Sequence, residues 1–121
     1  MLVDCPLPEP PWPGTQTIRP VRTLREVRQA GDRFQNCLRD PSCALPVFAG
    51  DLAIYIVESS KGPACASLKH DRVLRSWRLN EIKGLRNARL PPHLSRSIRD
   101  AFAAAGFPYL PVSPLGHWCD F

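Results

Sequence analysis

The chain has 121 residues, of which 44% are hydrophobic and 22% are charged. This length and balance fit one compact globular domain and argue against two domains or wholesale disorder. No stretch of about 18 apolar residues occurs, and the first residues lack the basic and apolar regions of a signal peptide. We therefore expect a cytoplasmic protein without a membrane partner.

The net charge of +5 is distributed unevenly along the chain. Between Lys61 and Arg99 there are ten basic residues and two acidic ones, a balance of +8, which leaves −3 for the rest. Most of the basic residues are arginine, whose planar guanidinium group binds phosphate and carboxylate through two parallel hydrogen bonds. This distribution predicts a nucleic acid or an acidic protein surface as the partner.

The five cysteines are an odd number in a chain without an export signal. We expect reduced thiols that pack as small hydrophobic groups. No Cys-x-x-Cys or His-x-x-x-His pair occurs, so we expect neither a metal site nor a cofactor. A site shared by Cys5, His117 and Cys119 is conceivable only if the two ends of the chain meet.

Proline divides the chain into three parts. Six of the 14 prolines lie between Pro6 and Pro20, and they exclude a helix there because proline lacks an N–H donor and fixes φ. We predict an extended arm over residues 1–21, a core domain over 22–106 and an irregular tail over 107–121. The arm either packs on the domain through Trp12 and Ile18 or serves as a polyproline ligand for an aromatic groove.

The first predicted helix follows the arm. Thr23 and Glu26 form a capping box, and an apolar stripe follows on one helix face, made of Leu24, Val27, Phe34 and Leu38. The helix should end before Pro41. Gly31 weakens its centre and indicates a break or a close contact. Residues 43–50 are expected to be a short connecting piece.

Three strands and a last helix complete the prediction. The segments 52–57, 64–69 and 73–80 have strand composition and short connections, which favours an antiparallel meander in which Arg75, Trp77 and Leu79 share a face. Pro91 and Pro92 open the last helix, and Gly106 ends it. Its apolar face consists of Leu94, Ile98, Ala101, Phe102 and Ala105. The fold class is α+β, with about three strands and with an N-terminal and a C-terminal helix packed on one face of the sheet.

Short motifs in the core resemble the PcfJ-like proteins, a family of bacterial plasmids, phages and chromosomes. They are Asn36-Cys37-Leu38, Gly50-x-x-x-Ile54-Tyr55, the small-residue strand 64–68, and Trp77-x-Leu79-x-Glu81-Ile82-Lys83-Gly84-x-x-Asn87. The resemblance covers about residues 33–106 and implies a mobile-element setting without an established reaction. Two positions depart from the family's pattern. The family's tyrosine after Asn-Cys is absent between Arg39 and Phe48. The position that is acidic in the family's second strand is occupied here by Lys69 or His70.

Two residues are candidates for catalysis. Cys37 is a possible nucleophile with His70 or His93 as its base, and Glu81 is a possible general base. Cys37 falls at the carbonyl end of its predicted helix, where the helix dipole disfavours a thiolate. A packing role for Cys37 is therefore the stronger interpretation, and an enzyme of unknown reaction is the alternative function.

The segment after the third strand has two interpretations. Glycine at position 84 permits a tight turn whose backbone amides bind an anion. Alternatively, Gly84 and Asn87 only adopt left-handed turn conformations, and Glu81 pairs with Lys83 or Arg86.

The predicted binding surface collects the arginines around these elements. It consists of Arg72, Arg75, Trp77, Arg78, Lys83, Arg86, Asn87 and Arg89. Trp77 either stacks on a base between two arginines or belongs to the core. The favoured hypothesis is a mobile-element accessory protein that binds nucleic acid or an acidic protein surface, for example to inhibit a host nucleic-acid complex. A third hypothesis is an assembly protein with Trp12 and Trp118 at an oligomer interface; the sequence does not determine the oligomeric state.

Overall fold

The computed structural model of the chain describes residues 5–110, except the side chains of Cys37 and residues 41–44. The predicted tail beyond residue 110, with His117, Trp118 and Cys119, lies outside the described residues. The fold is α+β, as the sequence predicted.

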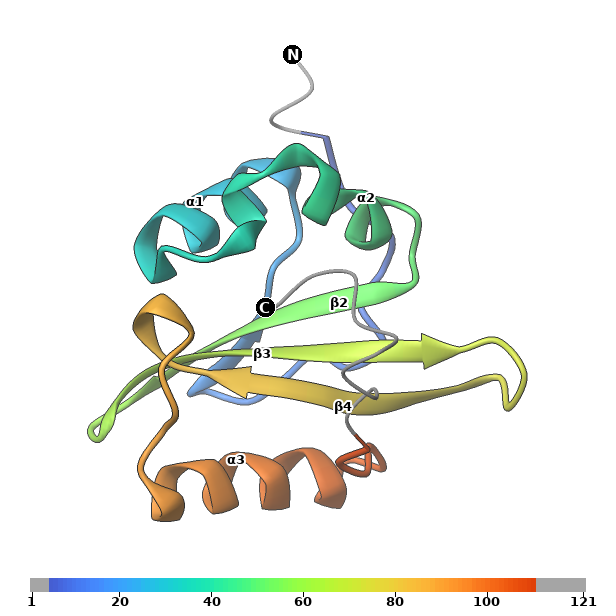
Figure 1. Cartoon of the computed structure of the whole chain (residues 1–121). Coiled ribbons are helices and arrows are strands. Elements are labelled where there is room, and N and C mark those ends of the chain that lie inside the picture. The colour runs from blue at the N-terminus through green and yellow to red at the C-terminus, as the bar shows by residue number, and fades with distance from the viewer. Residues whose placement is uncertain (1–4, 111–121) are drawn as a thin grey trace.

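A four-stranded antiparallel meander forms the centre of the molecule (Figure 1). Its strands are β1 (Ile18–Pro20), β2 (Leu52–Ser59), β3 (Gly62–Asp71) and β4 (Ser76–Lys83), in the order β1-β2-β3-β4. The prediction of about three strands missed β1, which is the end of the proline-rich arm. Ile18 pairs with Val57 and Pro20 with Tyr55. Proline is tolerated here because β1 is an edge strand.

Helices cover both faces of this sheet, so the prediction that they pack on one face is wrong. Figure 1 shows α1 (Leu24–Phe34) and α2 (Pro41–Phe48) on one side and α3 (Pro92–Ala104) on the other. The physical reason lies in β2, where Leu52 to Val57 are all buried. A strand that is apolar on both sides needs a cover on both sides.

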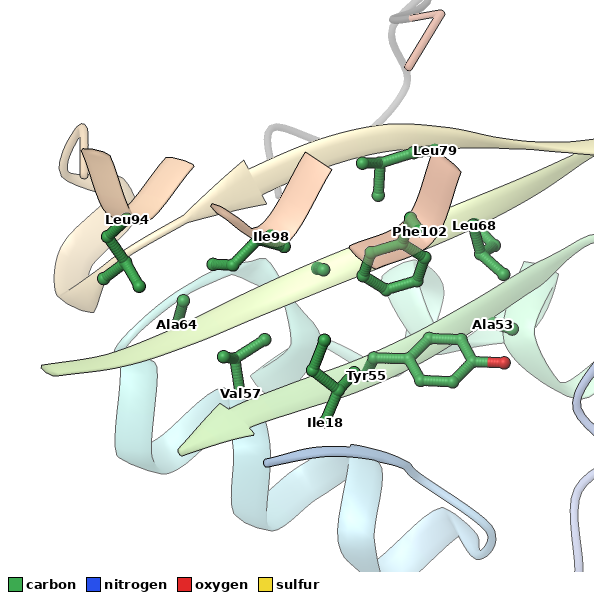
Figure 2. Close-up of a cluster of buried hydrophobic side chains, with 11 residues drawn as sticks. Ile18, Ala53, Tyr55, Val57, Ala64, Leu68, Leu79, Leu94, Ile98 and Phe102 are labelled. Carbon is green, nitrogen blue, oxygen red and sulfur yellow. The ribbon is translucent and has the colours of Figure 1, made fainter. Parts of the chain in front are cut away.

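Each face of the sheet has its own core cluster. Towards α1 and α2, the cluster contains Val27, Phe34, Leu38, Val47, Leu52, Ile54, Ile56 and Cys65. Towards α3, Figure 2 shows the three buried residues of the helix, Leu94, Ile98 and Phe102, over side chains of the sheet such as Tyr55, Ala64 and Leu79. The predicted apolar face of the last helix is thus confirmed at these three positions.

A β-bulge in β4 changes which side chains face α3. Ser67 pairs with Glu81, but its neighbour Leu68 pairs with Leu79, so Asn80 is the extra residue. Trp77 and Leu79 therefore lie on the α3 side together with Ile82, three residues on. By the strand alternation, Arg78, Glu81 and Lys83 project to the opposite side.

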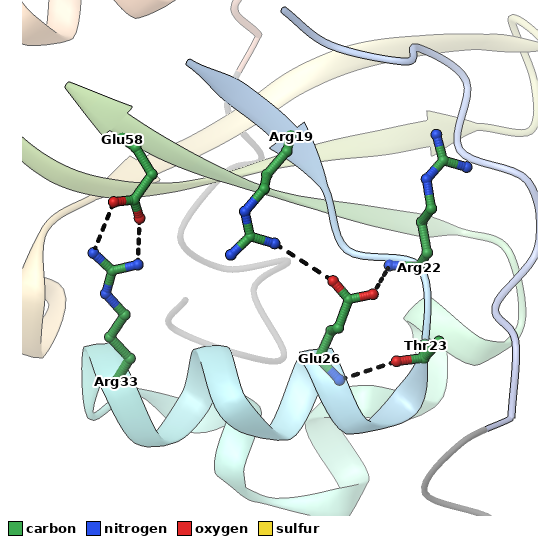
Figure 3. A network of polar contacts seen from close by, with 6 residues as sticks. All are labelled: Arg19, Arg22, Thr23, Glu26, Arg33 and Glu58. Carbon is green, nitrogen blue, oxygen red and sulfur yellow. Dashed lines mark hydrogen bonds and ion pairs between the residues drawn. The ribbon is translucent and has the colours of Figure 1, made fainter. Parts of the chain in front are cut away.

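The N-terminus of α1 is held by the predicted capping box. The side chain of Thr23 accepts a hydrogen bond from the amide of Glu26, and the Glu26 carboxylate accepts one from the amide of Arg22. Figure 3 shows these contacts, the ion pair of Glu26 with Arg19, and the two bonds from Arg33 to Glu58 on β2. Glu26 and Glu58, which lie outside the basic segment, thus pair with Arg19 and Arg33.

The first helix ends earlier than predicted. It stops at Phe34, and Gln35 adopts a left-handed conformation with φ of 51°. A short 3-10 helix, η2 (Cys37–Arg39), folds back over the helix. A Cβ on Gly31 would lie 2.4 Å from the amide nitrogen of Arg39. Gly31 therefore marks a close contact, one of the two roles expected for it.

The segment that was expected to be a short connecting piece is largely helical. Residues 41–48 form α2, although Pro46 lies inside it. Pro41 occupies the first helical position, where a proline costs no hydrogen bond. Tertiary packing overrides the local signal, because Val47 is buried in the α1-side cluster.

The arm packs on the domain instead of remaining free as a ligand. Trp12 lies over Tyr55, Phe102 and Phe107, with ring centroids 5.8, 4.8 and 6.2 Å away. The Tyr55 hydroxyl donates to the Trp12 carbonyl at 2.7 Å and accepts from the Trp12 amide at 3.1 Å. Burial raises the pKa of Tyr55 to about 12.

Candidate functional site

Nine of the ten cations of the basic segment lie in two groups at opposite ends of the β3–β4 hairpin, and the tenth, Arg99 on α3, lies over the ring of Tyr109. The hairpin end carries Lys69, Arg72, Arg75 and Arg78 around the turn between the strands. The other end, called here the η3 end after the short helix η3 (Leu85–Asn87), carries Lys61, Lys83, Arg86, Arg89 and Arg96. Lys83 lies five positions after Arg78 along β4, which is about 17 Å of strand. The predicted binding residues therefore do not form one continuous patch.

Carboxylates neutralise much of the hairpin end. Arg72 binds Asp51 through two hydrogen bonds of 2.7 and 3.2 Å, and Arg78 binds Asp71 at 3.0 Å. The other Asp71 oxygen accepts from the amides of Val73 and Leu74 at 2.9 and 3.0 Å. The Leu74 amide, then the Val73 amide and the Arg78 guanidinium, lower the pKa of Asp71.

Trp77 does not share a face with the arginines beside it. Its ring packs against the α3-side cluster and lies 5.1 Å from the ring of His70, its partner across the strands. Arg75 belongs to the turn with φ of 53° and does not continue the strand. Trp77 is thus partly buried against the core, and the predicted common face holds for Trp77 and Leu79 but not for Arg75.

The η3 end has a different electrostatic character. Within residues 5–110, no ion pair engages Lys61, Lys83, Arg89 or Arg96. Glu58, the acidic residue next to the β2–β3 turn, is already bound to Arg33. Arg86 donates its Nε–H to Gln35 Oε1 at 2.9 Å, so its charge stays uncompensated. Of these groups, Lys61, Arg86, Arg89 and Arg96 are exposed and Lys83 is partly buried.

Several elements bring these cations to one end of the molecule. Lys61 lies in the turn that starts β3, and Lys83 pairs with Cys65 near the same end of that strand. Figure 2 places Leu94, in the first turn of α3, beside Ala64 and Val57 at this end of the sheet. Arg96 lies two residues further along that turn. The chain between β4 and α3 carries Arg86 and Arg89.

The turn after β4 differs from the predicted anion-binding turn. Its left-handed residues are Arg86 and Asn87, with φ of 55° and 59°, whereas Gly84 has φ of −91°. The Gly84 amide donates to the Ala88 carbonyl at 2.8 Å, so it is not free to bind an anion. A Cβ on Gly84 would lie 3.2 Å from Cδ2 of Leu90, a tight contact that the Leu90 side chain would have to relieve.

The catalytic candidates come from neighbouring segments. The bond between Gln35 and Arg86 joins the segment that precedes Cys37 to the turn that contains Asn87. Glu81 lies on β4, opposite Ser67 of β3, and projects to the side of the sheet that faces away from α3. The side chain of Cys37 is outside the described residues. The structure therefore offers no geometry for a nucleophile and base pair.

Two buried polar atoms near this junction lack hydrogen-bond partners among the described residues. They are Nδ2 of Asn36 and Oδ1 of Asn87. The side-chain oxygen of Asn36 does have a partner, because Oδ1 accepts a hydrogen bond from the Leu38 amide at 3.0 Å. Asn36 thus braces the start of η2.

The remaining chemistry-bearing residues do not indicate a reactive centre. Cys65 is fully buried, and burial raises the pKa of its thiol, which keeps it protonated and unreactive. No group of three or more histidine, cysteine, aspartate or glutamate side chains that could hold a metal occurs among residues 5–110.

Sequence reasoning missed parts of this arrangement. Lys61 and Arg96 were absent from the predicted binding set because they lie outside the strand and turn that carried the motif. The sequence around them offers no signal, since Glu58 lies three residues before Lys61 and Asp100 lies four residues after Arg96.

Comparisons with known proteins give no match for this chain: no protein-family model, no curated protein and no solved structure is significantly similar to it. The resemblance to the PcfJ-like family stays a prediction. No helix in the described part of the chain is both long and apolar enough to cross a membrane.

Proposed function

We propose that this chain is an accessory binding protein that contacts the phosphates of nucleic acid through its η3 end. The observation that carries the proposal is the difference between the two groups of cations. Arg72 and Arg78 at the hairpin end are bound to aspartates. The cations of the η3 end have no carboxylate partner among the described residues and remain available to an external anion.

Phosphate contacts of this kind bind without reading sequence. Lysine and arginine gain affinity from nucleic acid mainly by releasing the counterions condensed on it. The η3 end supplies about four such groups. Trp77, the aromatic residue of the predicted set, lies at the hairpin end, partly buried against the α3-side cluster, so it does not offer a ring to a base at the η3 end. We therefore expect weak, salt-dependent and sequence-independent binding.

The biological setting rests on the resemblance to the PcfJ-like proteins. In a plasmid or phage, a small basic protein of this kind would act as an accessory factor or would occupy the nucleic-acid site of a host complex. An acidic protein surface that mimics phosphate would fit the same cations, because arginine binds carboxylate and phosphate with the same fork geometry.

Binding to a fluorescein-labelled duplex DNA of mixed sequence, followed by anisotropy at several salt concentrations, tests this proposal. Four phosphate contacts predict that the association constant falls on the order of 100-fold between about 50 and 200 mM salt. Replacing Arg89 and Arg96 by alanine should remove about half of this salt dependence, because two of the four contacts are lost.

The matched control is Arg75→Ala, which removes one exposed cation from the hairpin end. It should leave DNA affinity within about twofold of the parent. If the parent binds no DNA, or if Arg75→Ala weakens binding as much as the double variant at the η3 end, the proposal is wrong.

A further inference from the structure

The tip of the β3–β4 hairpin projects beyond β2 and α2. The pairing of β2 with β3 reaches as far as Lys69, which lies opposite Leu52. Within the described residues, positions 71–76 of the hairpin therefore have no further strand on the β2 side, and Figure 1 shows their turn extending past α2. From Lys69 to Val73 at the tip is about 13 Å of extended chain. An arm of this length can reach the surface of a neighbouring molecule.

Two adjacent apolar side chains form the tip. Val73 is 91% exposed and Leu74 is 70% exposed, between the exposed Arg72 and Arg75. Turns are ordinarily built from glycine, proline, asparagine, aspartate and serine. Because covering an apolar side chain with another apolar surface is favourable in water, this tip is suited to contact with another molecule.

The tip is held in a fixed conformation before any contact. Asp71 accepts hydrogen bonds from the amides of both apolar residues and also binds Arg78. The two bonds from Arg72 to Asp51 tie the base of the turn to the residue that precedes β2. A rigid tip loses little conformational entropy when it is buried against a partner.

An open groove of about 470 Å³ lies beside the tip, between the end of α2 and β3. Leu45 is 65% exposed in this groove, and Phe48, one helical turn further, is 50% exposed. The tip and the groove share Arg72 and form one surface, called here the hairpin surface. The lining of the groove consists of Leu45, Pro46, Ala49, Asp51, Lys69, His70 and Arg72.

The charged groups of the hairpin surface are largely engaged within the chain. Three of its four cations have interaction partners, namely Lys69, Arg72 and Arg78. Asp51, which lines the groove, binds Arg72 through both of its oxygens. Arg75 is left without an ion pair among residues 5–110. The surface therefore favours neither a strongly acidic nor a strongly basic partner, and two copies of it can face each other with little repulsion between like charges.

The shape of the hairpin surface is complementary to itself. A convex apolar tip and a partly apolar groove lie side by side, so a twofold rotation can place the tip of each copy in the groove of the other. We infer that the hairpin surface is the interface of a symmetric homodimer, with Val73 and Leu74 of each copy against Leu45 and Ala49 of the other. The η3 end lies at the opposite end of the hairpin and stays open, so the inference does not depend on nucleic-acid binding.

The apolar area of the hairpin surface suits a weak dimer. An exposed valine, leucine or phenylalanine side chain offers roughly 100 Å² of apolar surface, so Val73, Leu74, Leu45 and Phe48 together offer about 280 Å² in each copy. A standard interface buries about 800 Å² per partner, of which somewhat more than half is apolar. The area here lies at the low end of specific interfaces, and we expect association in the micromolar range.

Sedimentation equilibrium of the full chain between about 5 and 500 µM tests the inference. The weight-average mass should rise with concentration from that of one chain to that of two chains and no further, because a twofold contact closes on itself. The dissociation constant should change less than about threefold between about 50 and 500 mM salt, since most charges at the interface are already paired within each copy.

Variants of the tip and of the groove locate the contact. The Val73→Ser and Leu74→Ser double variant should weaken dimerisation about tenfold or more, because each side chain is buried twice in the dimer. Leu45→Ser should also weaken it, since the tip of the other copy lies against this residue. Leu85→Ser removes an exposed apolar residue at the η3 end and is the matched control, which should dimerise like the parent. All these side chains are exposed in the single chain, so each variant should keep the parent's circular dichroism.

A measurement on the parent protein needs no substitution. The amide resonances of Val73, Leu74 and Ala49 should shift as the protein concentration rises, whereas that of Arg89 at the η3 end should stay in place. The inference is wrong if the parent remains a single chain at about 500 µM or associates beyond two chains. It is equally wrong if either the double variant or Leu45→Ser dimerises as tightly as the parent, or if a monomeric parent binds lipid vesicles through Val73 and Leu74.

Discussion

At the scale of single residues, Gly31 shows how one missing side chain sets a packing distance. It lies in the middle of α1, where glycine costs about 0.5–1 kcal/mol relative to alanine. The protein tolerates that cost because η2 crosses α1 at this point. The atoms that a Cβ would meet belong to the backbone of Leu38 and Arg39, at 2.6 and 2.4 Å, and backbone cannot rotate away.

We predict that Gly31→Ala destabilises the protein by about 1–3 kcal/mol through overpacking. The effect is measured as a lower urea midpoint at an unchanged m-value. Helix propensity alone would make the same substitution stabilising, so the sign of the change separates the two effects. Gln29→Ala, at an exposed position of the same helix, is the control and should change stability by less than about 0.5 kcal/mol.

At the scale of elements, the β3–β4 hairpin depends on one carboxylate. Asp71 holds the turn through two amides and pairs with Arg78 across the strands. These contacts favour its charged form and lower its pKa. A carboxyl group whose pKa is lower in the folded state stabilises the turn above its unfolded value of about 3.9, and this contribution is lost as pH falls through the folded value.

The corresponding prediction concerns the acid titration of the hairpin. The amide resonances of Val73 and Leu74 should follow the protonation of Asp71 with a midpoint below about 3.9. Asp71→Asn keeps an acceptor for the amides and should remove this titration while the rest of the fold stays intact. A midpoint at or above the ordinary value would contradict the role of Asp71 in the turn.

At the scale of the whole molecule, the arm is part of the fold. Trp12 and Phe102 reach Tyr55 from opposite ends of the chain, and the Tyr55 hydroxyl satisfies both backbone groups of Trp12. Buried polar groups of this kind cost about 1–3 kcal/mol when they lose their partner. The side chain of Tyr55 therefore contacts both the arm and α3 and joins them to the sheet.

The raised pKa of Tyr55, about 12, makes the stability of the fold depend on pH. Because the unfolded chain releases this proton near pH 10, stability should fall as pH rises from about 10 towards 12. Tyrosinate absorbance should include a step near 12, and Tyr55→Phe should remove this step and lower stability by about 1–3 kcal/mol. The lack of any step near 12 in the parent would show that Tyr55 is not held as described.

Much of the fold followed from local patterns. The capping box at Thr23, the apolar face of α3 and the meander were predictable because each depends on residues close together in sequence. The helix α2 and the strand β1 were missed because proline argues against both, and the packing of Val47 and Ile18 outweighs that local preference.

The candidate site was predictable only in part. The sequence indicated where cations are concentrated, but the bulge at Asn80 and the pairing of Arg72 and Arg78 with aspartates depend on contacts between strands. Val73 and Leu74 looked like ordinary strand residues. Their exposure follows from the position of the turn, which Asp71 sets.

The sequence by itself determined the α+β class, the basic composition and the proline-rich arm, because composition, periodicity and capping act over a few residues. Only the tertiary structure decided that helices cover both faces and that the arm joins the sheet. It also decided that the cations lie at two ends of a hairpin and that aspartates neutralise part of the charge at one end only. These features depend on which distant residues meet, and a charge counted along the chain carries no information about the carboxylate that lies beside it in space.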